Sequence, residues 1–168
     1  KFQYWDDLLT SMRPRHWVKN VLVFTAIVFA EKMGEPMALA RTILVFGVFC
    51  FLSSAQYLFN DLLDKTKDAY HPSKRYRPIA QGRMSASSVL LWFLVLTSIS
   101  FGVTYVLGER LFFASAAFLL VGLLYSLFLK NVVIIDAFAI AAGYLLRTIA
   151  GALAIDVPVS SWLLICTF

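Results

Sequence analysis

The sequence predicts an all-α membrane protein, a polytopic bundle of transmembrane helices. Of its 168 residues, 60% are hydrophobic and 15% are charged, whereas a soluble domain is about half apolar and about a quarter charged. Mean hydropathy is +0.76. The apolar residues occur in long runs, most of which have roughly the length that a helix needs to cross a bilayer. No segment has the composition of a second, soluble domain, so residues 1–168 are expected to form one transmembrane domain.

The apolar runs predict about five full spans and the start of a sixth. The expected spans are 17–30, 39–59, 85–107, 111–129 and 132–155, with the sixth beginning at 159. The first run is short for a crossing unless its helix tilts or its polar flanks reach the interface. Because the sixth run stops after ten residues, we expect the chain to be the N-terminal part of a longer protein. Residues 1–15 predict a short amphipathic helix in the membrane interface.

Lysine and arginine are unevenly distributed between the two sides of these spans. Eleven lie on the side that carries residues 60–83, three lie on the other side, and Arg147 lies within a span. Positively charged loops mark the cytoplasmic side, so we expect a multi-pass protein of the cell (inner or plasma) membrane with this segment in the cytoplasm. The net charge of +5 is then explained by topology and does not indicate binding to nucleic acid.

The segment 60–83 begins on a helix that has one polar stripe. At 100° per residue, Asn60, Asp61, Asp64 and Asp68 fall on one side of that helix, within an arc of roughly 120°. Carboxylates beside hydrocarbon are costly unless they are paired or bind a ligand. Carboxylate and amide oxygens suit Mg²⁺ that is held jointly with substrate phosphates. We therefore predict a metal site on these four residues, with the three aspartates as catalytic residues.

A basic run follows the acidic stripe, and further basic residues lie at the cytoplasmic ends of the first and fourth spans; all of them can hold phosphate oxygens. The predicted phosphate-binding residues are Arg15, Lys19, Lys74, Arg75, Arg77 and Lys130. Carboxylates for a metal and cations for an anion, together at a membrane surface, are what a diphosphate substrate requires. The alternative interpretation is a solvated loop whose charges only set the orientation of the protein.

The fifth span carries a second group of candidates. Four of its residues lie within about 80° of one another on a helix: Asp136, Gly143, Arg147 and Gly151. Small residues on this face would let a neighbouring helix approach closely. Arg147 lies inside the span, where a charge needs a carboxylate, a phosphate or a water-filled cavity. A structural ion pair and a role in a substrate cavity are both open; the cavity candidates are Tyr57, Tyr125 and Arg147.

The chain resembles the UbiA-type intramembrane transferases. Residues 60–68, NDLLDKTKD, match NDxxDxxxD, the first aspartate-rich motif of that superfamily. RPRHWVKN at 13–20, HPSKRYRPIAQG at 71–82 and the run from Asp136 through Gly143 to Arg147 narrow the resemblance to the decaprenyl-phosphate phosphoribosyltransferase family. The resemblance implies a UbiA-like bundle of nine spans, with a second aspartate-rich motif in the half that follows this chain.

The resemblance also implies an enzyme, a Mg²⁺-dependent glycosyltransferase of the pentosyltransferase type. Its reaction would transfer 5-phosphoribosyl from phosphoribosyl diphosphate to a polyprenyl (decaprenyl) phosphate and release diphosphate. In actinobacteria the product would feed the synthesis of cell-wall arabinan precursors. By position, Asn60, Asp61, Asp64 and Asp68 would hold Mg²⁺ and the diphosphate, and phosphate contacts would come from Lys19, Lys74, Arg75 and Arg77.

Two other functions are compatible with these residues. A UbiA-type prenyltransferase would use the same acids to bind Mg²⁺ and a prenyl diphosphate, and would alkylate an aromatic or lipid acceptor. A cation-binding transporter would line a pathway with them, although these acids cluster at one end of the spans. The sequence determines neither the length of the polyprenyl chain nor the oligomeric state, and an oligomer is compatible with it.

Overall fold

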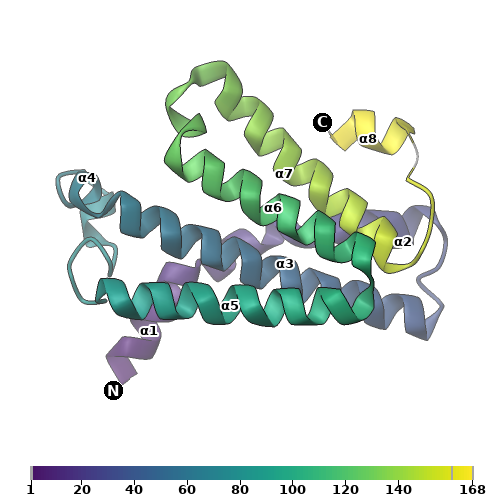
Figure 1. Cartoon of the computed structure of the whole chain (residues 1–168), viewed down its shortest axis with the longest axis horizontal. Helices are drawn as coiled ribbons and strands as arrows, with labels where there is room; N and C mark the ends of the chain where they lie inside the picture. The colour runs from purple at the N-terminus through teal and green to yellow at the C-terminus, as the bar shows by residue number, and fades with distance from the viewer. Residues whose placement is uncertain (1, 160, 168) are drawn as a thin grey trace.

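A computed structural model describes residues 2–159 and 161–167, and all regular structure in these residues is helical (Figure 1), which confirms the all-α prediction. The elements are α1 (Phe2–Met12), η1 (Pro14–Phe24), α2 (Thr25–Phe29), α3 (Pro36–Leu63), α4 (Lys65–Ala69), η2 (Lys74–Tyr76), α5 (Ala86–Leu107), α6 (Glu109–Leu127), η3 (Leu129–Asn131), α7 (Val133–Ala154) and α8 (Ser161–Thr167). The η elements are 3₁₀-helices.

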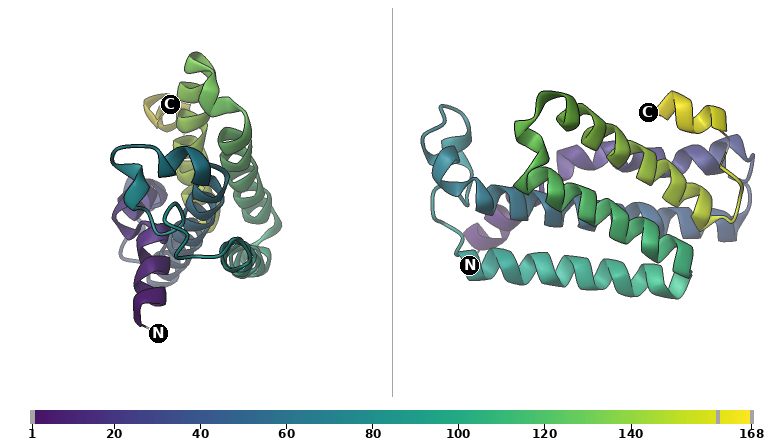
Figure 2. Two further views of the ribbon diagram at one scale, coloured as in Figure 1. Left: turned by 90° about the vertical axis from the view of Figure 1, so that its left-hand side faces the viewer. Right: turned by 45° about the horizontal axis from the view of Figure 1, so that its top comes forward.

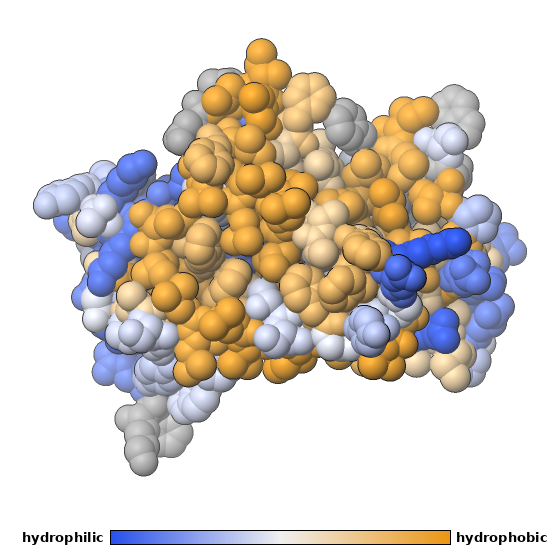
Figure 3. Space-filling model, viewed as in Figure 1, coloured by the Kyte–Doolittle hydropathy of each residue, from blue (hydrophilic) through white to orange (hydrophobic). Residues whose placement is uncertain are grey.

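Four of the described helices are long and apolar enough to cross a membrane: α3, α5, α6 and α7 from Ile134 onward. They correspond to the second to fifth predicted spans. Apolar side chains form a broad band over the middle of the molecule, and polar side chains gather at both ends of its long axis (Figure 3). This distribution is that of a multi-pass membrane protein.

The first predicted span differs from the other four. Only Thr25–Phe29 are α-helical there, and the eleven residues before them form the 3₁₀-helix η1. A 3₁₀-helix rises about 2.0 Å per residue and an α-helix about 1.5 Å. Together η1 and α2 therefore reach about 30 Å, which is the thickness of the hydrocarbon core. The 3₁₀ conformation supplies the length that this short run lacks as an α-helix.

Helix α3 is the centre of the bundle. It packs against α1, η1, α5, α6 and α7 (Figures 1 and 2). Phe49 and Leu52 of α3 are fully buried in an apolar cluster that also takes in η1, α2, α6 and α7. Leu58, two turns further on, belongs to a second cluster with side chains of α1, α5 and the segment before α5. The polar segment 60–83 thus begins where α3 leaves the second cluster.

The segment 60–83 is not a simple continuation of α3, as a single polar stripe would require. Helix α3 ends at Leu63, Asp64 forms the junction, and Asp68 belongs to the short helix α4. Further along, Ile79 is fully buried in the second apolar cluster. Gly82, at φ +73°, allows the turn that leads the chain into α5. Ile79 therefore anchors the loop and returns its basic residues to the end of α3.

Helix α1 packs one face against the bundle. Leu8 and Met12 are buried in the second cluster, and Asp7 pairs with Arg83 at 3.1 Å. Trp5 and Leu9 are exposed on the other face. The amphipathic helix expected here is present, and its placement in the membrane interface remains a prediction.

Candidate active site

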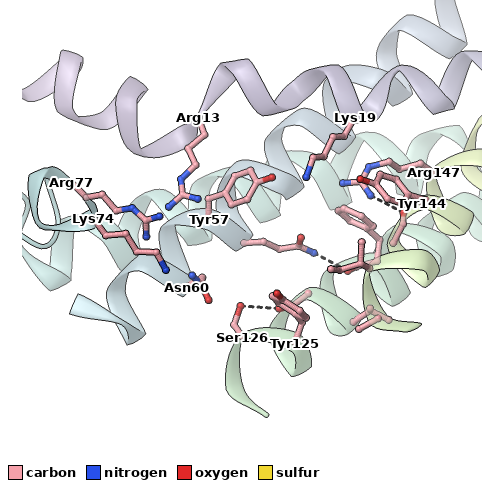
Figure 4. Close-up of a pocket in the computed structure, with 17 residues that line it drawn as sticks. Arg13, Lys19, Tyr57, Asn60, Lys74, Arg77, Tyr125, Ser126, Tyr144 and Arg147 are labelled. Carbon is pink, nitrogen blue, oxygen red and sulfur yellow. Dashed lines mark hydrogen bonds between the residues drawn. The ribbon is translucent and has the colours of Figure 1, made fainter. Parts of the chain in front are cut away.

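A cavity of about 330 Å³ lies among η1, α3, α6 and α7, with η2 and the residue after it at one end. This volume is typical of a small-molecule site. Five cationic side chains line the cavity (Figure 4): Arg13, Lys19, Lys74, Arg77 and Arg147. Among the described residues, no carboxylate lines it. The cavity is therefore suited to an anion.

At one end of the cavity, two aspartates hold two of these arginines. Arg13 Nη2 donates to both carboxylate oxygens of Asp61, at 2.5 and 2.7 Å. Arg77 Nη1 bridges Asp61, at 3.0 Å, and Asp68, at 2.6 Å. Lys74 lies 4.0 Å from Asp68 at the end of this network. Asp61 and Asp68 are each only 3% exposed, so these two carboxylates are shielded from water and hold the partly exposed arginine side chains in place.

The backbone explains how both arginines reach Asp61. Arg13 has φ +55° and separates α1 from Pro14, the first residue of η1. This left-handed conformation costs a residue with a side chain about 1–2 kcal/mol, which the ion pair with Asp61 offsets. Arg77 precedes Pro78, is therefore extended, and lies two residues from the buried anchor Ile79. Each arginine is thus placed by a local backbone constraint as well as by charge.

A separate pairing links the end of α3 to the turn between α6 and α7. Lys130 Nζ donates to Asp64 Oδ2 at 2.6 Å and to Asn60 Oδ1 at 3.3 Å. Asn60 also lines the cavity. All three aspartates of the motif are therefore paired with cations of this chain.

Arg147 lines the cavity from α7. Its guanidinium donates to Asn20 Oδ1 at 2.6 Å and to the carbonyl oxygen of Gly143 at 2.8 Å. It also lies over the Phe118 ring, 4.6 Å from the centroid. Within the described part of the chain, Arg147 has no carboxylate partner. Of the two roles open for this residue, the structure therefore favours the cavity.

The predicted site residues fall into three groups. Those that line the cavity are Lys19, Tyr57, Asn60, Lys74, Arg77, Tyr125 and Arg147. Asp61, Asp64, Asp68 and Lys130 do not line it, but they contact residues that do or one another. Arg15 and Arg75 are exposed and lie outside it. Arg75 donates to Tyr76 Oη at 2.6 Å.

The predictions missed several residues of the site, among them Arg13, Gln56 and Asn20. Arg13 lies at the turn before Pro14, and sequence spacing does not reveal which arginine of RPR points inward. Gln56 precedes Asn60 by four residues, so helical periodicity places it on the same face, and it lines the cavity. Asn20 is fully buried in contact with Arg147, and no sequence pattern distinguishes it from an interfacial asparagine.

His16, on η1, lies beside the cavity residue Tyr57, with 5.5 Å between the ring centroids.

The acidic residues form no ready metal cage. Within the described residues, no three histidine, cysteine or acidic side chains are arranged to hold a metal ion. Protein-bound Mg²⁺ is commonly held by one or two carboxylates together with substrate phosphates. The oxygen donors of Asn60, Asp61, Asp64 and Asp68 suit that shared mode of binding. For Mg²⁺ to bind in this way, substrate phosphate must attract the arginine and lysine side chains that are paired with the aspartates in this structure.

Residues 20–168 match the UbiA prenyltransferase family, and the chain belongs to this family. One curated relative is a decaprenyl-phosphate phosphoribosyltransferase from Mycolicibacterium smegmatis, which is 35% identical over 95% of this chain and 52% of the relative. Another is the nodulation protein NoeC from Azorhizobium caulinodans, which is 34% identical over 89% of this chain and 48% of the relative. The chain thus spans about half the length of these relatives.

The fold also matches a solved structure. A UbiA homolog from Archaeoglobus fulgidus bound to GPP and Mg²⁺ superposes with a TM-score of 0.82, at 21% identity, over 96% of this chain and 58% of that one. This likeness establishes the fold as that of UbiA proteins.

The positions of Arg13 and Arg15 lead to a matched prediction. In the full-length protein, Arg13→Met is expected to weaken binding of inorganic diphosphate about tenfold or more, because a hydrogen bond to a charged group contributes about 1.5–3 kcal/mol and about 1.4 kcal/mol is tenfold in affinity. Arg15→Met removes the same charge two residues away, outside the cavity, and is expected to change the affinity less than twofold. Titration calorimetry measures both, and equal losses would contradict the placement of Arg13.

Proposed function

We propose that the protein transfers 5-phosphoribosyl from phosphoribosyl diphosphate to a polyprenyl phosphate and releases diphosphate. The observation that carries this proposal is the cavity lined by five cations, next to three aspartates at one end of the bundle. Relatives named decaprenyl-phosphate phosphoribosyltransferase, which are 32–35% identical to the chain, support the choice of substrates.

Catalysis of this reaction depends mainly on stabilising charge and much less on transferring protons. The bond between C1 of the ribose and the diphosphate oxygen breaks, and its electron pair leaves with the diphosphate. An oxygen of the lipid phosphate forms the new bond to C1, where positive charge has developed. The acceptor is already an anion at neutral pH and needs no strong base. Positioned cations that stabilise the departing diphosphate are therefore the main catalytic requirement.

The side chains divide this work by position. Arg13, Lys74 and Arg77 would bind the diphosphate, because they line one end of the cavity. The carboxylates of Asp61 and Asp68 hold the two arginines until phosphate arrives. Asn60, Asp61, Asp64 and Asp68 would hold Mg²⁺ together with the phosphate oxygens, and the metal would neutralise negative charge on the leaving group.

The location follows from the same proposal. The segment 60–83 would face the cytoplasm, as the distribution of lysine and arginine predicts, and the lipid acceptor would be drawn from the cell membrane. Helix α1 would lie in the membrane interface on that side, with Trp5 and Leu9 toward the lipid. In an organism whose cell wall contains arabinan, the product would serve as a precursor of that arabinan.

The test is a transfer assay on the full-length protein in detergent with Mg²⁺. Phosphoribosyl diphosphate labelled in the ribose is incubated with a polyprenyl phosphate, and the label is expected to move into the organic phase. A parallel reaction offers a labelled prenyl diphosphate and an aromatic acceptor. Transfer of the prenyl group without transfer of phosphoribosyl would contradict the proposal and favour a prenyltransferase.

A further inference from the structure

We propose that the cavity holds two separate anion subsites, and that the subsite at Arg147 binds a phosphomonoester. The other subsite is the group of Arg13, Lys74 and Arg77. The identity of the phosphomonoester rests on the proposed function. The existence of two subsites rests only on the placement of side chains.

The charge of Arg147 is not balanced by the chain around it. Arg147 is 8% exposed, and the groups that it contacts are an amide, a carbonyl, a hydroxyl and aromatic rings, all of them neutral. A buried charge is costly without a partner of opposite sign. By contrast, Asp61 pairs with both Arg13 and Arg77. An anionic ligand would supply the missing partner of Arg147.

Arg147 is held in a fixed orientation with donors to spare. Asn20, which is fully buried, accepts from Nε, the Gly143 carbonyl accepts from Nη1, and Ser53 Oγ lies 3.4 Å from Nη2. A guanidinium has five N–H donors, so one on each terminal nitrogen is left by these contacts. Phe118 and Tyr144 lie 4.6 and 5.6 Å from the guanidinium carbon, measured to the ring centroids. Two donors on one planar group match two oxygens of a phosphate.

The two subsites lie at different ends of the cavity. Asn20, the partner of Arg147, is on η1, seven residues beyond Arg13, which directly precedes η1. At about 2.0 Å per residue, the backbone positions of Arg13 and Asn20 are about 14 Å apart along the helix axis. Figure 4 shows Lys19, Tyr144 and Arg147 at one end of the cavity and Arg13, Lys74 and Arg77 at the other. Lys19 adds a second cation to the Arg147 subsite.

The proposed reaction offers two phosphomonoesters for this subsite. One is the 5-phosphate of the sugar donor, and the other is the phosphate of the lipid acceptor. Both present the same dianionic group to Arg147 and Lys19, so their chemistry at the subsite is shared, and binding measurements distinguish them.

The experiment measures binding to the full-length protein in detergent with three probes: inorganic diphosphate, ribose 5-phosphate and polyprenyl phosphate. Arg147→Met is expected to leave the affinity for diphosphate within twofold and to weaken the binding of one of the two phosphomonoesters at least tenfold. Weaker binding of ribose 5-phosphate assigns the subsite to the sugar donor, and weaker binding of polyprenyl phosphate assigns it to the lipid acceptor. An equal loss of diphosphate binding would overturn the proposal of two subsites, as would no change for any probe.

A second variant keeps the test independent of folding. Asn20→Asp preserves the shape of the side chain, so the variant is expected to fold. It gives Arg147 the carboxylate partner that it lacks, and is therefore expected to weaken binding of the same phosphomonoester that Arg147→Met affects. Arg110→Met removes a charge at an exposed position and is the control. If Asn20→Asp binds all three probes like the wild type, the subsite is not at Arg147. The transfer assay on the wild type tests the proposed function separately, since it does not depend on these variants.

Discussion

Replacing Asp61 with asparagine is expected to lower the transfer rate of the full-length protein about a hundredfold or more and to destabilise it by about 3 kcal/mol. Asp61 is 3% exposed and accepts hydrogen bonds from both Arg13 and Arg77. Removing one partner of a buried ion pair leaves the other charge uncompensated, which is strongly destabilising. The same change removes a proposed metal ligand. The rate of label transfer and the thermal midpoint in detergent measure the two effects.

A double variant separates these effects. Arg13 has Asp61 as its carboxylate partner, whereas Arg77 also bonds Asp68. Adding Arg13→Met to Asp61→Asn is therefore expected to recover a good part of the lost stability while the transfer rate stays low. Asp6→Asn, which changes an exposed aspartate on α1, is the control and is expected to alter neither quantity. Normal transfer by Asp61→Asn protein would contradict a role for this carboxylate in the site.

Replacing Gly151 with alanine is expected to have the largest effect on stability outside the aspartate motif. A Cβ at this position would lie 2.0 Å from the carbonyl oxygen of Val23 and 2.9 Å from its carbonyl carbon. Backbone atoms of η1 cannot turn aside as a flexible side chain can, so η1 and α7 must separate. Overpacking of this kind costs about 1–3 kcal/mol or more, and we expect a clear fall in the thermal midpoint.

The same substitution is expected to affect ligand binding. Gly151 follows Arg147 by four residues on α7, and Val23 follows Asn20 by three on η1, so the clash lies next to the bond between Arg147 and Asn20. Gly102→Ala, on an exposed face of α5 with nothing within 4 Å of the added Cβ, is the matched control. It is expected to be neutral or to stabilise by about 0.5–1 kcal/mol, because alanine favours a helix over glycine. Equal effects of the two changes would show that the close contact between η1 and α7 is absent.

The elements of this protein were largely predictable. Ser85 at the N-cap of α5, Gly108 between α5 and α6, and the apolar runs between these signals place the second to fifth spans within a few residues of the observed helices. The first span was predicted as an apolar run and is mainly a 3₁₀-helix. Hydropathy reports the apolar character of a segment and says nothing about its rise per residue.

The candidate site was predictable in its chemistry and less so in its geometry. Helical periodicity groups Tyr57, Asn60 and Asp61 on one face, and Tyr57 and Asn60 do line the cavity. The same periodicity does not predict that α3 ends before Asp64, nor that each aspartate is paired with a cation of this chain. Arg13 and Arg15 are alike in sequence context, and only the left-handed turn at Arg13 directs that side chain inward.

The sequence alone determined that this is a helical membrane protein of the UbiA type, because hydropathy, helical period and the NDxxDxxxD motif are local properties of neighbouring residues. Three features are decided by the tertiary structure alone: which cations line the cavity, the hydrogen bond from Arg147 to Asn20, and the close approach of η1 to Gly151. Asn20 and Arg147 are 127 residues apart in the chain. Their contact depends on how η1 and α7 pack, and packing is a property of two surfaces that no local pattern contains.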